Sequence, residues 1–448
     1  MVEMETKIKV AERSRSYERY KDSGVAWLGE IPEHWEITRL ANIGRFSSSG
    51  IDKLIKKNES LVKIINYTDV YKNLELIINS AINFMEVTTP ESNRIKNLVK
   101  KGDLIFLPSS ETLEDLGLSA LVDEDIENLS FSYHVLRFEF TAEVAHRFKK
   151  YFTNNKKGLN EFSKKGTGSI RKTLGRNDFR NTIVTLPPLQ EQTAIAQFLD
   201  DKTTKIDEAI NIKQQQISLL KERKQILIHK AVTQGLNPNV KLKNSGVEWI
   251  GEIPEGWDLL PGFMVYKENK TKNHGMTENV VLSLSYGNIV IKPKEKLVGL
   301  VPESFETYQI VKPGDIIIRC MDLQNDKTSL RTGIAVNDGI ITSAYLNLNI
   351  VNNNVSEYVY NFLHSLDTTK VLYKFGTGLR QNLSFGDFKH LQIPIPPKEE
   401  QETIVDYIEN ITQKIETAIS LKQQEIAKLK EYKSSLINSV VTGKVKVC

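Results

Sequence analysis

Cysteine and long apolar runs are nearly absent from this 448-residue sequence. Only Cys320 and Cys448 are present, so no disulfide framework is expected, and this cysteine content fits a reducing cytoplasm. No apolar run reaches the roughly 18 residues that a membrane span needs. Residues 1–20 are charged throughout and lack the apolar segment of a secretory leader. We therefore expect a cytoplasmic protein that contacts no membrane.

Catalytic signatures are also missing. The sequence has no G-x-x-x-x-G-K-[ST] phosphate loop, no glycine-rich dinucleotide turn after a strand, and no Asn-Pro-Pro-aromatic tetrad suggestive of base methylation. The seven histidines are scattered, and none has metal-ligand spacing. His34, His134 and His390 are therefore expected to be packing or surface residues. We predict no catalytic residue, no metal and no cofactor on this chain.

Length and composition are those of a two-domain globular protein. A chain of 448 residues exceeds one hydrophobic core. Apolar residues make up 40% and charged residues 26%, which is ordinary for a soluble fold. The formal net charge of +4 permits nucleic acid as a partner but does not demand it, because the local distribution of charge matters more than the sum.

The sequence contains a direct repeat. Residues 21–37 (KDSGVAWLGEIPEHWEI) and 243–259 (KNSGVEWIGEIPEGWDL) are identical at 11 of 17 positions. A second pair of similar segments begins at Gly166 (GTGSIRKTLGRNDFRNTIVTLPPLQEQ) and at Gly376 (GTGLRQNLSFGDFKHLQIPIPPKEEQ). Each copy of this second pair leads directly into a long charged segment. The chain therefore consists of two homologous modules, each a globular domain followed by a helix.

Weaker similarities between the modules predict matching strands. Residues 99–106 (VKKGDLIF) resemble 311–318 (VKPGDIII), and 132–138 (SYHVLRF) resemble 343–349 (SAYLNLN). In the first pair a Gly-Asp turn precedes a β-branched, apolar run, which is typical of a strand entered through a tight turn.

The interiors of the two modules differ. Residues 42–98 and 260–310 cannot be aligned with each other, although the ends of the modules match. We therefore predict an α+β fold in which two similar globular α/β domains carry different surfaces. Two long antiparallel coiled-coil helices separate the domains, and the repeat gives the chain an internal pseudo-two-fold relation.

Two long helices are the clearest predicted elements. Pro187-Pro188 and Pro396-Pro397 end the domains, and no glycine or proline falls between Leu189 and Thr233, so the first helix could extend roughly 65 Å. Apolar residues then recur at coiled-coil spacing. The predicted helix–helix packing residues are Ile206, Ile210, Ile217, Leu220, Leu227, Ile415, Ile419, Ile426, Leu429 and Leu436. A solvated linker helix is the alternative interpretation.

These features set the expected boundaries. They are an N-terminal extension (1–20), a first domain (21–188), a first spacer helix (189–234), a second domain (235–397) and a second spacer helix (398–448).

Repeated tryptophans and carboxylates have structural explanations. Trp27, Trp35, Trp249 and Trp257 flank Gly-Glu-Ile-Pro turns, and we expect them to anchor the chain at each domain entry more than to stack on bases. The acids of the NDF and GDF segments (177–179 and 386–388) are expected to cap a helix or turn more than to form a carboxylate site.

Basic, glycine-containing segments before each Pro-Pro are the candidate DNA contacts. Glycine permits close backbone approach, hydroxyls and amides donate to phosphate oxygens, and arginine reaches phosphate or guanine. The candidates are Lys164, Lys165, Thr167, Ser169, Arg171, Lys172, Arg176, Lys374, Thr377, Arg380, Gln381 and Asn382. A solvated basic loop is the alternative.

The SGVxWxGEIPxxW openings, the GTG…DF…PPxxEQ blocks and the long helices resemble the specificity subunits of type I restriction–modification systems. The resemblance extends from about Tyr17 to Val445, and only the segment before Tyr17 departs from it. It implies a non-catalytic, DNA-recognising subunit with two target recognition domains, whose helices bind two modification (methyltransferase) subunits. S-adenosylmethionine, ATP and Mg are then expected on partner subunits, with separate restriction subunits performing translocation and cleavage.

Two other classes of function stay open at this point. A free-standing nucleic-acid methyltransferase would bind S-adenosylmethionine by itself, and a scaffold protein would bind no duplex. If the resemblance holds, the divergent interiors predict an asymmetric, bipartite target with half-site centres roughly 10 bp apart.

Overall fold

The computed structural model describes residues 16–293, 304–326, 328–375 and 382–447. By its internal contacts the chain forms two compact units, which we describe separately. Unit 1 comprises residues 1–212 and 424–448, and unit 2 comprises residues 213–423. Each unit thus holds one globular domain and part of both long helices, whereas the sequence assigned one whole helix to each module.

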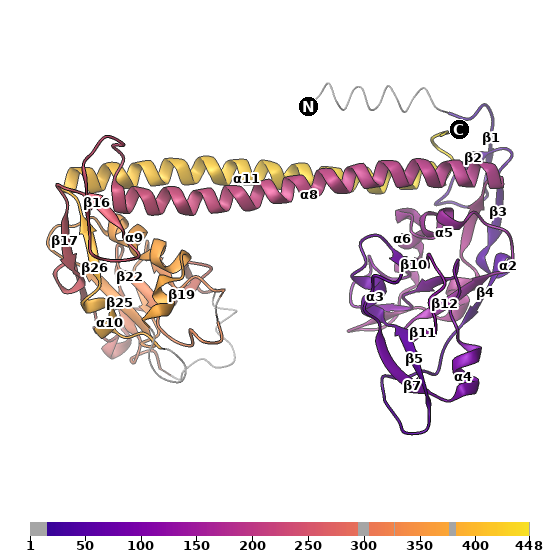
Figure 1. Ribbon diagram of the computed structural model, residues 1–448, viewed down its shortest axis with the longest axis horizontal. Coiled ribbons are helices and arrows are strands. Elements are labelled where there is room, and N and C mark those ends of the chain that lie inside the picture. The colour runs from indigo at the N-terminus through magenta and orange to yellow at the C-terminus, as the bar shows by residue number, and fades with distance from the viewer. Residues whose placement is uncertain (1–15, 294–303, 327, 376–381, 448) are drawn as a thin grey trace. The chain divides into compact units, whose positions relative to one another are not determined.

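The first domain contains short strands and short helices (Figure 1). Its strands are β1 (Tyr20–Asp22), β2 (Glu30–Pro32), β3 (Glu36–Arg39), β4 (Gly44–Ser47), β5 (Ser60–Ile65), β6 (Ile77–Ile78), β7 (Met85–Thr89), β8 (Leu104–Phe106), β9 (Ser109–Ser110), β10 (Ser119–Val122), β11 (Leu129–Phe131), β12 (Leu136–Phe140), β13 (Lys172–Thr173) and β14 (Ile183–Leu186). Its helices are α2 (Leu40–Ile43), α3 (Tyr67–Tyr71), α4 (Glu91–Lys96), the 3-10 helix η1 (His146–Phe148), α5 (Lys149–Thr153), α6 (Lys156–Lys165) and α7 (Arg176–Arg180).

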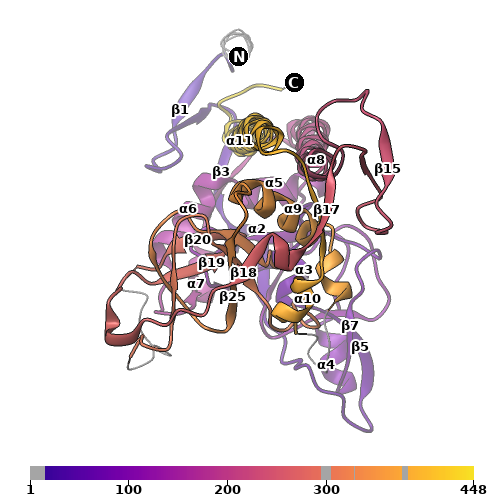
Figure 2. The same ribbon diagram turned by 90° about the vertical axis from the view of Figure 1, so that its left-hand side faces the viewer.

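The second domain has the same mixture of elements (Figure 2). Its strands are β15 (Leu242–Asn244), β16 (Glu252–Pro254), β17 (Asp258–Pro261), β18 (Tyr266–Glu268), β19 (Leu282–Ser285), β20 (Asn288–Ile291), β21 (Gln309–Val311), β22 (Ile316–Arg319), β23 (Thr332–Ile334), β24 (Gly339–Ile341), β25 (Tyr345–Ile350) and β26 (Gln392–Ile395). Its helices are η2 (Gly262–Met264), η3 (His274–Met276), α9 (Ser356–Thr368), η5 (Val371–Lys374) and α10 (Phe385–Lys389).

Equivalent sheets form the centre of both domains. The first has the strand order β4-β12-β8-β10-β6, and the second has the order β18-β25-β22-β23. The pairs β8–β12 and β22–β25 are antiparallel in both. Burial of Phe106 and Phe138 in one sheet and of Ile316 and Leu348 in the other removes these side chains from water. The α+β fold with two similar domains is confirmed.

The two Gly-Asp turns predicted from sequence lead into central strands. Gly102 has φ +91° and Gly314 has φ +89°, a left-handed conformation that favours glycine. The carboxylate of Asp103 then accepts a hydrogen bond from the amide of Lys100 at 2.9 Å. Asp315 accepts the equivalent bond from Lys312 at 2.8 Å. The turn closes on itself in both domains before the strand begins.

The sequence match between residues 132–138 and 343–349 differs by one residue from the match that the strand pairing gives. Arg137 lies opposite Ile105, and Asn347 lies opposite Ile317. Arg137 and Asn347 are therefore counterparts, whereas the sequence comparison placed Arg137 against Leu348. A shift of one residue moves a side chain to the other face of a sheet, so only the strand pairing fixes the correspondence. Both side chains then face the carboxylate of the Gly-Asp turn, Arg137 at 3.7 Å from Asp103.

A long helix follows each domain along the chain. Helix α8 spans Leu189–Gln234 and α11 spans Lys398–Val441, so the second helix ends before the expected residue 448. Within each unit their segments lie alongside one another, as both views show (Figures 1 and 2). In unit 1 the Lys433 ammonium lies 2.6 Å from Asp207, and in unit 2 the Lys224 ammonium lies 2.7 Å from Glu416. Early residues of one helix meet late residues of the other, so the helices run antiparallel within each unit.

The predicted apolar seam lies on the covered face of these helices. Its ten residues are all buried or half-buried, with Ile217 only 2% exposed. In unit 1, Ile206 and Leu436 belong to one apolar cluster with the first domain. Among the described residues, no helix is both long enough and apolar enough to cross a membrane.

Repeated tryptophans join each domain to the start of the helix that follows it. The indole nitrogen of Trp35 donates to Glu191 at 3.0 Å, and that of Trp257 donates to Glu400 at 3.1 Å. Both rings are buried. In the first domain Tyr17 also donates to Glu191, at 3.0 Å, although it falls within the expected N-terminal extension. The Gly-Glu-Ile-Pro segments are therefore structural anchors, and Tyr17 belongs to the first domain.

Candidate nucleic-acid interface

A short closed loop carries the candidate residues of the first domain. It follows α6 and is closed by a bridge between Thr167 and Thr173, whose backbone amide and carbonyl groups bond to each other. Gly168 has φ +114°, and a Cβ atom there would lie 2.3 Å from the carbonyl oxygen of Arg171. No larger residue fits this turn without rearrangement, so the glycine sets the shape of the loop.

The candidate residues of this loop have different surroundings. Lys164 is paired with Glu161 at 2.5 Å, which neutralises part of its charge. Lys165, Thr167 and Ser169 are exposed. Arg176 donates from Nη2 to the hydroxyl of Ser48 at 2.8 Å. Lys172 is half-buried and donates to the carbonyl of Gly168 within its own loop.

Arg171 is held by residues that the sequence did not single out. Its Nε donates to the Ser109 hydroxyl at 3.0 Å, and its guanidinium carbon lies 4.7 Å from the centre of the Tyr67 ring. Tyr67 lies within residues 42–98, which have no counterpart in the other module, so the repeat, which was the main signal in the sequence, could not reveal it. Ser109 lies three residues after the similar segment 99–106.

Two positively charged side chains act on the His134 ring. His134 has a lowered pKa, first because it is partly buried and then because Lys53 and Arg171 repel an added proton. The His134 ring lies against Tyr133, with ring centres 3.9 Å apart, and Tyr133 is 53% exposed. Arg171 and Lys53 are thus both near enough to His134 to act on its charge, and the exposed Tyr133 ring lies beside His134.

The second domain presents its candidates differently. Thr377, Arg380 and Gln381 lie outside the described residues. Lys374 lies 3.6 Å from the carboxylate of Glu248. Asn382 is exposed and accepts a hydrogen bond from the amide of Asp322 at 3.0 Å. The end of the candidate segment is thus tied to the loop that follows β22.

A buried arginine fixes that loop. Arg331 is 0% exposed, and its guanidinium stacks over Tyr373 with a centre distance of 5.1 Å. Its nitrogens donate to the Tyr373 hydroxyl at 3.2 Å and to the carbonyls of Arg319 at 3.3 Å, Met321 at 2.7 Å, Asp322 at 3.2 Å and Asp326 at 2.6 Å. Because all five N–H groups can be satisfied there, the charge tolerates burial. Arg331 therefore determines the path of residues 319–326.

The paired acids of the NDF and GDF segments form helix caps. Asp178 accepts from the Gly175 amide at 2.8 Å at the start of α7. Asp387 accepts from the Ser384 amide at 2.7 Å at the start of α10. Both carboxylates compensate amides that the first helical turn leaves without partners. The capping interpretation is confirmed.

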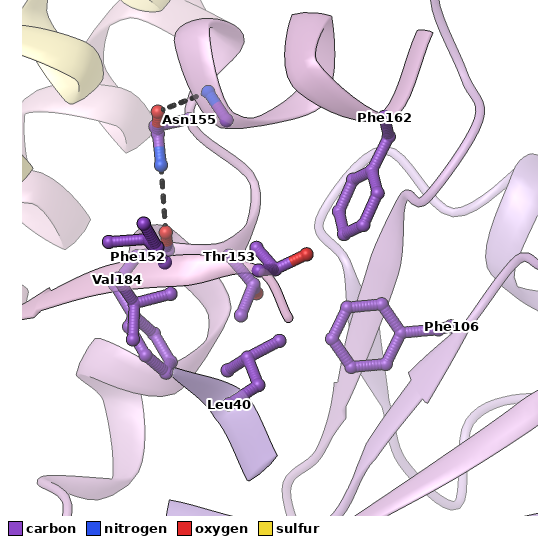
Figure 3. Close-up of a pocket in the computed structure, with 10 residues that line it drawn as sticks. Leu40, Phe106, Phe152, Thr153, Asn155, Phe162 and Val184 are labelled. Atoms are coloured by element: carbon purple, nitrogen blue, oxygen red, sulfur yellow. Dashed lines mark hydrogen bonds between the residues drawn. The ribbon is translucent and has the colours of Figure 1, made fainter. Parts of the chain in front are cut away.

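Groups with catalytic potential do not converge in the described residues. No cluster of three or more His, Cys, Asp or Glu side chains suited to a metal occurs there. Burial raises the pKa of the Cys320 thiol to about 12, so it stays protonated near neutral pH. A small gap in the first domain, shown in Figure 3, has a volume of about 10 Å³ and is lined mainly by apolar side chains such as Phe106 and Phe162. It has room for about one water molecule and for no organic cofactor.

Comparisons with known proteins identify relatives that match nearly the whole chain. The sequence model of the type I restriction modification DNA specificity domain matches residues 32–221 and 262–431. A putative type I restriction enzyme specificity subunit, MjaX, from Methanocaldococcus jannaschii is 23% identical over 437 residues, covering 94% of this chain and 96% of that protein. The MjaVIII specificity subunit of the same organism is 24% identical over 434 residues, covering 93% and 94%.

Solved structures with a similar fold cover nearly the whole chain. A chain from a study of assembly and conformational transition of the type I restriction–modification system matches with a TM-score of 0.65 and 16% identity, covering 92% of this chain and 98% of the other. The HsdS subunit of Thermoanaerobacter tengcongensis matches with a TM-score of 0.51 and 17% identity, covering 93% and 98%. Both similarities concern the fold.

Proposed function

This chain belongs to the type I restriction modification DNA specificity family, and we propose that it recognises an asymmetric, bipartite DNA target on behalf of a methyltransferase complex. The chain itself is a specificity subunit of such a system. We further propose that two methyltransferase subunits dock on this chain and that the chain itself performs no catalysis.

One observation carries the proposal of a bipartite target. The two domains repeat the same buried scaffold contacts, such as Trp35–Glu191 and Trp257–Glu400, while their surfaces differ. Arg171 lies exposed on a tyrosine in the first domain, whereas a buried Arg331 organises a loop in the second. Two similar domains with unlike surfaces fit two unlike half-sites.

Sequencing methylated bases tests this directly. The chain is expressed with its methyltransferase partner, and the modified motif is determined across the host genome. We expect two different short sequences separated by base pairs of any identity. A palindromic or uninterrupted motif would contradict the proposal.

The spacer helices offer a second test of the same idea. Inserting about four residues, one helical turn, after Gln216 should lengthen the gap and leave both half-sites unchanged. An insertion that alters a half-site would show that the domains do not act as separate recognition units.

Two equivalent helical faces support docking of two methyltransferase subunits. Gln214, Gln215 and Lys221 are exposed on α8, and their repeats Gln423, Gln424 and Lys430 are exposed on α11. Lys224 and Lys433 are half-buried in ion pairs between the helices, so they are not part of this surface. Native mass spectrometry should detect two methyltransferase subunits for each copy of this chain, and an assembly limited to one would contradict the docking proposal.

Catalysis is assigned to the partners. We propose that the methyltransferase subunits hold S-adenosylmethionine and that restriction subunits use ATP and Mg, because the sequence lacks the motifs for these ligands. Binding of S-adenosylmethionine by the isolated chain would favour a free-standing methyltransferase instead. Failure of the assembled complex to bind any duplex would favour a scaffold.

A further inference from the structure

Arg171 differs from the other described basic candidates in how it is held. Lys164 and Lys374 have acidic partners, and Lys172 donates within its own loop. Arg176 uses one of its terminal nitrogens, Nη2, to bond to the Ser48 hydroxyl, and the exposed Lys165 has no planar fork of donors. Arg171 has only the Ser109 hydroxyl at Nε and the face of Tyr67. In the part of the chain that the structure describes, no hydrogen bond reaches its Nη1 or Nη2. The two terminal nitrogens of an exposed guanidinium are thus available to a ligand.

The Tyr67 ring under this guanidinium, which we call the platform, is held in place by contacts of its own. Tyr67 stacks on Tyr71 with ring centres 5.3 Å apart and an interplanar angle of 23°. Both belong to α3, whose first turn is closed by a 2.7 Å bond from the Asn66 amide to Asp69. The Tyr67 hydroxyl also donates to Ser110 at 3.5 Å.

Strand pairing joins the platform to the loop that carries Arg171. Strand β13 begins at Lys172, the residue after Arg171, and pairs with β9. Strand β9 supplies Ser109, which accepts from Nε, and Ser110, which accepts from Tyr67. The backbone beside Arg171 and both of its side-chain contacts therefore belong to one connected unit. Less conformational entropy is lost when such a side chain binds a ligand.

We propose that Arg171 recognises a guanine in the half-site of the first domain, with Tyr67 and Ser109 as positioning residues. The inference rests on the proposed function, in which this domain contacts DNA. A guanidinium whose Nε is occupied still presents two parallel N–H donors, which match the N7 and O6 acceptors of guanine in the major groove. Stacking on tyrosine holds the plane of that fork, which a lysine cannot reproduce.

A contact with phosphate is the competing outcome, and the two contacts differ in sequence dependence. A phosphate contact strengthens binding to every duplex and depends on charge alone. A bidentate contact of arginine to guanine acts at a single base pair and depends on the fixed geometry of the fork. Arg171→Lys separates them, because it keeps the positive charge and removes the fork.

The test uses the full chain assembled with its methyltransferase partner and duplexes derived from the target found by methylation sequencing. Each base pair of the first half-site is replaced in turn. For Arg171→Lys we expect affinity for the native duplex to fall roughly ten- to a hundred-fold, with discrimination lost at one G·C pair only. Discrimination within the second half-site and the salt dependence of binding should not change, because the charge is kept.

Two results would overturn the assignment. Equal weakening on every duplex would make Arg171 a phosphate contact, and unchanged binding would place it away from DNA. Wild-type complex that prefers no duplex would instead overturn the proposed function, so the two failures are distinguishable. Arg19→Lys, a surface residue paired with Glu33 at 3.0 Å, is the matched control and should leave affinity and preference as they are.

The positioning role is tested at Tyr67. Tyr67→Phe keeps the ring under the guanidinium, and Tyr67→Leu removes it. We expect the phenylalanine variant to discriminate at the Arg171 base pair like wild type. The leucine variant should lose roughly two- to five-fold of that discrimination, in line with the contribution of an exposed cation–π contact. Both variants are checked for an unchanged melting temperature, and equal discrimination by the two would rule out a positioning role of the ring.

Discussion

The two domains share their buried contacts and differ in how they hold their surfaces. Glu191 and Glu400 each accept from a buried tryptophan. Gln192 and Gln401 each donate to a proline carbonyl, at 2.8 Å and 2.9 Å, at the start of a long helix. These contacts join a domain to its helix.

The surface loops of the two domains are stabilised by different contacts. In the first domain an exposed Arg171 lies on a tyrosine, and the loop beside it is closed by its own backbone. In the second domain a buried Arg331 gathers four carbonyls, which consumes its donors inside the fold. The two modules thus share the contacts between domain and helix and differ in their surface loops. A loop can differ in this way because it needs only to satisfy its own polar groups.

The largest expected difference between the domains lies at Arg331. Replacing it with leucine leaves four carbonyls and the Tyr373 hydroxyl without their buried donor, which should destabilise the second domain by about 3–5 kcal/mol. Chemical unfolding followed by hydrogen exchange should locate the loss in residues 319–326. The matched variant is Arg137→Leu in the first domain, where Arg137 bonds to the Leu98 carbonyl and Glu139, and a smaller loss is expected. Equal losses of unfolding free energy in the two variants would mean that the two arginines contribute equally to stability.

Loss of either tryptophan–glutamate hydrogen bond should lower the free energy of unfolding, and the loss should be larger in the first domain. Glu400→Ala leaves the buried indole N–H of Trp257 without its acceptor, at a cost of about 1–3 kcal/mol. Glu191→Ala should cost more, because Tyr17 and His34 lose the same carboxylate. Calorimetry on the two variants measures the difference. A larger loss for Glu400→Ala would contradict this ranking.

The Gly-Asp turns should make stability depend on pH. Burial raises the pKa of Asp103 to about 6, and it also raises the pKa of Asp315. A carboxyl whose folded pKa exceeds its unfolded value stabilises the fold when protonated, so its contribution is lost as pH rises from about 4 through 6. Asp103→Asn should remove about 3 kcal/mol of this pH dependence, since the shift is about two pKa units. Identical pH profiles for wild type and variant, measured by urea unfolding, would show that Asp103 titrates normally.

The smallest effect is expected for the two ion pairs between the helices. Lys224–Glu416 and Lys433–Asp207 occupy equivalent positions of the repeat, and each is partly exposed. Double-mutant cycles should give about 0.2–1 kcal/mol for each pair, decreasing with added salt. A coupling well above that range at one pair alone would show that the two helix contacts are not equivalent.

Several features followed from local sequence. The lack of glycine and proline after Leu189, together with the apolar spacing, gave both ends of α8, whereas the expected range of α11 was about two helical turns too long at its C-terminal end. The caps at Asp178 and Asp387 were predictable because a helix start needs an acceptor close in sequence. The repeat itself identified the tryptophan anchors and the presence of two similar domains.

Other features depended on contacts between distant residues. Arg171 contacts Tyr67 and Ser109, which are both far away in the chain, and Tyr67 lies where the modules cannot be aligned. The burial of Arg331, among carbonyls from a preceding loop, has no signature in its neighbours.

The sequence by itself determined two α+β modules, their helices and their family. Periodicity, caps and turns act over a few residues, so they are visible in the order of the amino acids. Only the tertiary structure decided the register of Arg137 and Asn347, the inward position of Lys224 and Lys433, and the platform beneath Arg171. Those outcomes depend on which strands and helices pack together, and a shift of one residue in that packing sends a side chain to a different face.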